Sequence, residues 1–147
     1  MRRIPRVVIL GGLVAFGPLA ADGVAGKSPA DIDAMRIAGR LASEVLDFLT
    51  PHVKPGITTD ELDRLAESEI RSRKAIPAFK GYRNYPKTLC ASVNEQVVHG
   101  IPSKRKLKEG DILSVDCGAV VEGYVGDAAF TQSVQQDCVC SLREIDE

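Results

Sequence analysis

Apolar residues recur at helical spacing in two separate stretches of the first half of the chain. In the first stretch the apolar face consists of Ile32, Met35, Ala38, Leu41, Val45 and Leu49. This spacing predicts a helix over residues 28–50, with Ser28 as its N-cap. A second helix is predicted over residues 59–74, because Thr58 and Glu61 form a capping-box pattern ahead of a second apolar stripe.

After residue 74 the pattern changes from helical spacing to short β-like runs. Residues 75–88 are rich in proline, glycine and aromatic side chains and predict a loop. The predicted strands are LCASV (89–93), VVHGI (97–101), DILSVDCGAVV (111–121) and YVGDAAFTQSV (124–134). Turn-forming residues separate these runs, among them the pair at 122–123. Two helices followed by an antiparallel β-meander make an α+β fold.

The length and the charge of the chain exclude some classes of function. The chain has 147 residues, the size of one domain. Its 19 basic and 20 acidic residues give a formal net charge of -1, so no basic excess is present to neutralise phosphates. Direct nucleic-acid binding is therefore not expected. Four cysteines are too few and too unevenly spaced for a disulfide scaffold, which favours free thiols in a reducing compartment such as the cytoplasm.

The first 26 residues differ from the rest of the chain. Three arginines precede an uncharged run from Val7 to Ala21, which is the layout of a secretory signal. Residues 1–26 are therefore expected to be either such a signal, in which case the protein is exported, or an unstructured extension. The stretch AADGVAGKS also matches a relaxed phosphate-loop pattern, with Ala21 in place of the first glycine. A nucleotide-binding protein is accordingly one alternative function.

Asp116 and Asp127 carry the main chemical signal. Each lies in an apolar run, where a carboxylate is costly unless it is paired, hydrogen-bonded or bound to a metal. If residues 122–123 form a two-residue hairpin turn, Asp116 lies opposite Ala129 and Asp127 lies opposite Gly118. Both carboxylates then share one face as diagonal neighbours, about 7–8 Å apart at the backbone and within reach of a shared metal or metal pair. A three-residue turn would place them on opposite faces, and the remaining alternative is one buried, hydrogen-bonded aspartate and one turn aspartate.

Histidines and paired cysteines are further candidates. His99, in the run VVHGIP, is either a satisfied strand residue or a catalytic one. His52 follows the first predicted helix and suits a capping or surface role. Cys138-x-Cys140 has the spacing of a soft-metal pair, but no second pair completes four ligands.

Three segments together resemble the N-terminal half of a type I methionine aminopeptidase. They are SPADIDAMRIAGRLASEVLDFLTPHVKPGITTDELDRLAE, FKGYRNYPKTLCASVNEQVVHGIPS and LKEGDILSVDCGAVVEGYVGDAAFTQSV. The NE-x-VVHGIP and DILSVD…GY-x-GDAA motifs are specific to this family. The resemblance covers residues 27–134 and leaves residues 135–147 as an unrelated tail. It implies a pita-bread α+β fold, removal of the initiator methionine, and two divalent metal ions bound by two Asp, one His and two Glu side chains.

The resemblance also implies roles for particular residues. Asp116 and Asp127 match the two aspartate ligands, and His99 matches a catalytic histidine that contacts the substrate and does not bind metal. The positions that match the lining of the methionine pocket are Phe79, Tyr82, Tyr85 and Cys90, and His99 borders the substrate as well. A thioether packs well against aromatic rings and a thiol, which suits this set.

The other three of the five implied ligands have no match, because no histidine follows His99 and the family-like pattern ends near Ser133. We therefore expect a truncated member that is inactive or nearly so alone and that dimerises or binds a complementing half. Its expected partners are nascent peptides with an N-terminal methionine and the ribosome. The sequence does not distinguish Co, Mn, Fe, Zn or Ni as the metal. The alternative is a non-catalytic remnant that binds peptide N-termini or a partner protein.

Overall fold

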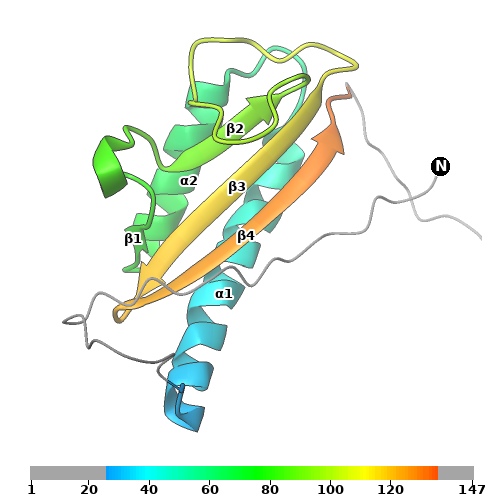
Figure 1. Cartoon of the computed structure of the whole chain (residues 1–147). Coiled ribbons are helices and arrows are strands. Elements are labelled where there is room, and N and C mark those ends of the chain that lie inside the picture. The colour runs from blue at the N-terminus through cyan, green and yellow to red at the C-terminus, as the bar shows by residue number, and fades with distance from the viewer. Residues whose placement is uncertain (1–25, 136–147) are drawn as a thin grey trace, which may run out of the picture.

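Two helices cover one face of an antiparallel sheet in the computed structural model, which describes residues 26–135 (Figure 1). This is the α+β arrangement predicted from the sequence. The signal-like extension, most of the phosphate-loop pattern, Cys138 and Cys140 lie outside the described residues. Within residues 26–135, neither helix combines the length and the apolar character that a membrane span requires.

Both predicted helices are confirmed. Helix α1 spans Pro29–Leu49 and helix α2 spans Thr59–Ser72. Ser28 caps the first and Thr58 caps the second, each in a complete capping box with the acidic residue three positions later. Such a cap stabilises a helix by about 1 kcal/mol. A short 3-10 turn, η1 (Thr50–His52), follows α1 and contains the proline that stops the α-helix.

Strand β3 (Ile112–Val121) is the centre of the sheet. Strand β4 (Tyr124–Ser133) pairs antiparallel with its whole length. Strand β2 (Leu89–Val93) and the two-residue β1 (Ile76–Pro77) share the other edge of β3, at opposite ends. The turn at 122–123 has two residues with positive φ, 50° and 87°, the geometry that fits a tight hairpin.

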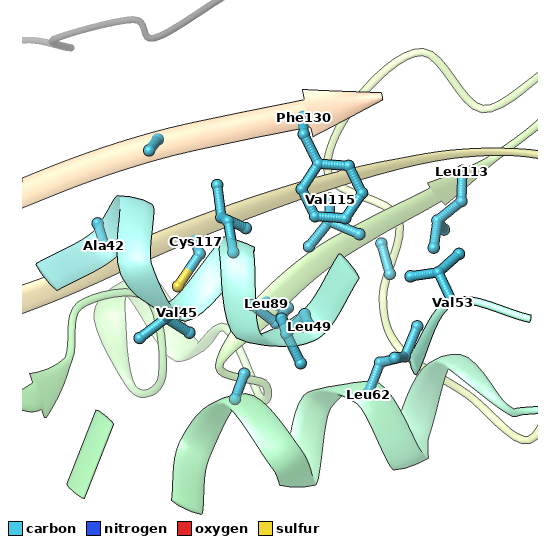
Figure 2. Packing of buried hydrophobic residues seen from close by; sticks show 14 of the residues in the cluster. Ala42, Val45, Leu49, Val53, Leu62, Leu89, Leu113, Val115, Cys117 and Phe130 are labelled. Atoms are coloured by element: carbon cyan, nitrogen blue, oxygen red, sulfur yellow. The ribbon is translucent and has the colours of Figure 1, made fainter. Parts of the chain in front are cut away.

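The core lies between the helices and the sheet. Figure 2 shows Leu49, Leu62, Leu89, Val115 and Phe130 in this layer. Gly126 of β4 permits a close approach to α1, because a Cβ at this position would lie 2.1 Å from the carbonyl carbon of Ala38. Side chains alternate along a strand, so the residues on either side of Gly126 point away from the helices.

One predicted strand is wrong: VVHGI, residues 97–101, is a loop. Val97 is 86% exposed and Val98 is 66% exposed, so the apolar pattern here does not reflect burial in the core. His99 has a positive φ of 57°, which a strand does not accommodate. A backbone hydrogen bond joins this loop to β2 at Gly100.

The predicted loop over residues 75–88 is irregular apart from β1 and a 3-10 turn, η2 (Tyr82–Asn84). Phe79 from this segment lies against Gly118 of β3. Gly118 shares a face with Asp116, two positions earlier on the same strand. The loop therefore brings side chains to the face of the sheet that points away from the helices.

Candidate metal and substrate site

The β3–β4 hairpin places Asp116 and Asp127 on one face of the sheet. Asp116 pairs with Ala129 and Gly118 pairs with Asp127, the register predicted from a two-residue turn. Asp116 is half-buried. Burial, and then the hydrogen-bonded carboxyl of Asp127 beside it, raises the pKa of Asp116 to about 7. Two carboxyls this close cannot both ionise at low cost unless a cation is bound, so the pair favours the binding of a cation.

The chemistry of this pair fits part of a divalent metal site. Carboxylate oxygens are hard donors that suit divalent ions. The structure brings together no group of three or more His, Cys, Asp or Glu side chains within residues 26–135 that could hold a metal ion. The described residues thus offer two acidic donors to a metal, fewer than the five that the resemblance implies.

Three predicted pocket residues adjoin the aspartate pair. Cys90 of β2 pairs directly with Asp116. A Cβ on Gly118 would lie 2.6 Å from the Phe79 ring, so this ring covers the sheet next to Asp127. The Tyr85 hydroxyl lies close enough to the Cys90 thiol to influence its pKa. Burial raises the pKa of the Cys90 thiol and of the Tyr85 hydroxyl, so both groups are neutral near pH 7.

Tyr82 lies apart from these three. Tyr82 is 41% exposed, and the guanidinium of Arg83 lies 5.4 Å from the centre of its ring. The structure therefore places Tyr82 toward solvent, at the edge of the segment that carries Phe79 and Tyr85.

His99 is exposed on the loop that follows β2. The next residue, Gly100, is fixed to β2: its N–H donates to Ser92 Oγ at 3.1 Å and its carbonyl accepts from the Ala91 N–H at 2.7 Å. A Cβ on Gly100 would lie 2.3 Å from the Ala91 oxygen, so only glycine fits here. The backbone thus holds His99 beside β2 and leaves its ring open to solvent.

Other sequence-based candidates have structural roles. Cys117 points into the core and is fully buried, as strand alternation predicts. His52 Nδ1 lies 2.9 Å from the Phe48 carbonyl at the end of α1, which confirms a capping role. Ser28, the last residue of the phosphate-loop pattern, bonds to Asp31 through its N–H and its hydroxyl. Asp31 thus engages the N–H and the hydroxyl of Ser28, two groups that could otherwise bind a phosphate.

Asp63 of α2 lies near the site and was not among the residues predicted from the sequence. It is 3% exposed, and its Oδ1 accepts hydrogen bonds from the N–H groups of Thr88 at 2.8 Å and Leu89 at 2.9 Å. Burial raises the pKa of this carboxyl, and the two N–H donors oppose that rise. The available signal was its helical spacing from Ala66 and Ile70, which places an acidic residue on the buried stripe of α2.

Comparisons with known proteins show which family the chain resembles. Residues 33–143 match the model of metallopeptidase family M24. The chain is 54% identical over 109 residues to the methionine aminopeptidase of Clostridium acetobutylicum, which is 74% of this chain and 44% of that protein. Over 108 residues it is 50% identical to methionine aminopeptidase 1 of Bacillus subtilis, again 74% of this chain and 44% of the relative.

A solved structure gives the same result. The crystal structure of methionine aminopeptidase from Rickettsia prowazekii matches with a TM-score of 0.73 and 42% identity, over 76% of this chain and 44% of that one. The predicted fold, the N-terminal half of a pita-bread architecture, is thereby confirmed. The chain spans less than half the length of these relatives.

Proposed function

The chain belongs to metallopeptidase family M24, and we propose that it serves in the removal of the initiator methionine from the N-termini of nascent proteins. The observation that carries this proposal is the pair of carboxylates, Asp116 and Asp127, brought to one face of the sheet by the β3–β4 register. The methionine aminopeptidases that are 54% and 50% identical to this chain support the choice of substrate.

Asp116 and Asp127 are the residues that would hold divalent metal ions. When bound, such ions supply Lewis-acid chemistry and lower the pKa of water, which makes it a nucleophile at neutral pH. The two aspartates bring negative charge to a half-buried surface, where a cation lowers the cost of keeping both ionised. Their place on a paired hairpin fixes the spacing between them.

Neighbouring residues would bind and orient the peptide. Phe79, Tyr85 and Cys90 present an aromatic and thiol surface beside the aspartates, which suits the thioether of methionine. Exposed Tyr82 would contact the outer part of the substrate. The His99 ring, held beside β2 and open to solvent, would contact the substrate near the scissile amide.

A chimaera tests this function. Residues 27–134 replace the matching segment of the Clostridium acetobutylicum methionine aminopeptidase, and release of methionine from a Met-Ala peptide is measured with and without a chelator. We expect metal-dependent release, because the graft supplies both aspartates and the pocket residues. Asp116→Ala or Asp127→Ala abolishes release, and His99→Ala lowers kcat by roughly 10²-fold or more with a smaller change in KM.

Asp33→Ala is the matched control for the chimaera. Asp33 is an exposed acidic residue on α1, and the helix lies on the other face of the sheet. We expect its substitution to leave kcat and KM unchanged. A folded chimaera without activity, or one whose activity survives both Asp116→Ala and Asp127→Ala, would refute the proposal.

A further inference from the structure

A buried carboxylate of α2 is bonded to the start of the strand that carries the pocket thiol. Asp63 is 3% exposed, and one of its oxygens, Oδ1, accepts two hydrogen bonds. The donors are the backbone N–H groups of Thr88 and Leu89, at 2.8 and 2.9 Å. A carboxylate is costly to bury, so its place here calls for a specific role.

The bonds of Asp63 connect to the rest of the site through the backbone of Leu89. The residue after Leu89 is Cys90, which pairs with Asp116 across β2 and β3. The carbonyl of Leu89 accepts a hydrogen bond from the Tyr85 hydroxyl at 2.9 Å. The same hydroxyl lies 3.3 Å from the carbonyl of Gly100, the residue that follows His99.

Three segments of the site thus meet at the point that Asp63 fixes. They are the start of β2, the aromatic loop that carries Tyr85, and the loop that carries His99. No other side chain described in residues 26–135 is bonded to the N–H groups of Thr88 and Leu89. A shift of this oxygen would therefore move Cys90 directly, and the other two segments through Tyr85.

We propose that Asp63 is a positioning residue for the pocket, which acts through the place of its acceptor oxygen at the start of β2 and not through its charge. The inference rests on the proposed function only in taking the pocket's occupant to be the methionine side chain. The positions of Cys90, Tyr85 and the His99 loop depend on Asp63 whether or not metal or peptide is bound.

Two variants of the full chain separate oxygen position from charge. Asp63→Asn removes the charge and keeps an oxygen at the same place, whereas Asp63→Glu keeps the charge and moves the oxygen by one methylene. Both are made with Cys138 and Cys140 replaced by serine, and alkylation of the remaining thiols by iodoacetamide is followed by mass spectrometry. The Cys90 side chain is nearly buried and reports on the start of β2, while fully buried Cys117 reports on opening of the core.

We expect Asp63→Glu to speed alkylation of Cys90 by about tenfold, the order expected for losing well-placed hydrogen bonds in a local opening. Asp63→Asn stays within about threefold of the parent chain, since one acceptor oxygen is retained. Alkylation of Cys117 stays slow in both. Glu69→Asp and Glu69→Gln are matched controls, because Glu69 lies on the same helix and its side chain bonds to Arg73. Both leave the Cys90 rate unchanged.

Three results overturn the proposal: equal acceleration of Cys90 by both Asp63 variants, acceleration of Cys90 and Cys117 together, or no change in either thiol. If the longer side chain prevents folding, Asp63→Ala takes its place with the same expected result, because it deletes the acceptor without added bulk. The assay needs neither metal nor peptide. A failure here is therefore distinct from a failure of the chimaera to release methionine.

Discussion

Thr88 carries a buried hydroxyl with no hydrogen-bond partner, the sole such side-chain atom among the residues that the structure describes. A valine has nearly the same shape and removes the desolvated oxygen. We expect Thr88→Val to raise the free energy of unfolding by about 1 kcal/mol, seen as a higher urea midpoint with an unchanged m-value.

Thr59→Val is the matched control at this scale. Thr59 is also buried, but its hydroxyl accepts from the Ser103 N–H at 2.9 Å and donates to the Ser103 carbonyl at 3.2 Å. Valine at this position leaves those partners unpaired, so the free energy of unfolding falls by about 1–3 kcal/mol. Changes of the same sign in both variants would contradict the explanation.

Asp116 makes stability depend on pH in a direction opposite to that of an ordinary surface carboxylate. Its pKa is about 7 in the fold against 3.8 for the free side chain. Between these values the folded state binds more protons than the unfolded state, so this group's contribution to stability falls as pH rises from about 4 to 7. We expect the stability of Asp116→Asn relative to the parent chain to increase from pH 5 to pH 7.5 in the presence of a chelator. The measurement is the difference between the urea midpoints of the two proteins at each pH. An equal difference at both pH values would contradict this.

At the scale of elements, the contact between α1 and β4 depends on a missing side chain. A Cβ on Gly126 would lie 2.1 Å from the backbone of Ala38, which cannot move without shifting the helix. We expect Gly126→Ala to lower the free energy of unfolding by about 2–3 kcal/mol, measured by thermal unfolding. Gly56→Ala is the control: no atom approaches its Cβ, but its φ is 93°, so the cost is about 1 kcal/mol. A smaller effect at Gly126 than at Gly56 would refute the packing argument.

Local signals were sufficient for most elements. The capping residues Ser28 and Thr58 marked where the helices begin, and the turn at 122–123 fixed the register that aligns Asp116 with Ala129. The run VVHGI misled because β-branched residues predict a strand whether or not another strand pairs with them. The loop is instead exposed, has a positive φ at His99 and is bonded to β2 at Gly100, a contact that no local pattern reveals.

At the scale of the whole molecule, the site combines segments whose proximity depends on tertiary packing. Residue spacing placed Asp116 and Asp127 together on the condition of a two-residue turn, which the structure confirms. Phe79 reaches the same face of the sheet from the loop after β1, and Cys90 reaches it from β2. Residue spacing alone did not indicate that these two side chains lie beside the aspartates. Only the resemblance to a family assigned them to one pocket. Asp63 escaped notice because its partners are backbone N–H groups 25 and 26 positions away.

We expect the peptidase activity of the chain to depend on how many metal donors it brings together. Within residues 26–135 no three potential ligands converge, and metal affinity depends on the number of ligands and their supporting groups. We therefore expect the purified 147-residue chain, supplied with Mn²⁺ or Co²⁺, to release methionine from a Met-Ala peptide no faster than its Asp116→Ala variant. Free methionine is measured by mass spectrometry, with the active chimaera as the positive control. Metal-dependent release that Asp116→Ala abolishes would contradict the expectation. It would mean that the aspartate pair obtains further metal donors from outside residues 26–135 or from a second copy of the chain.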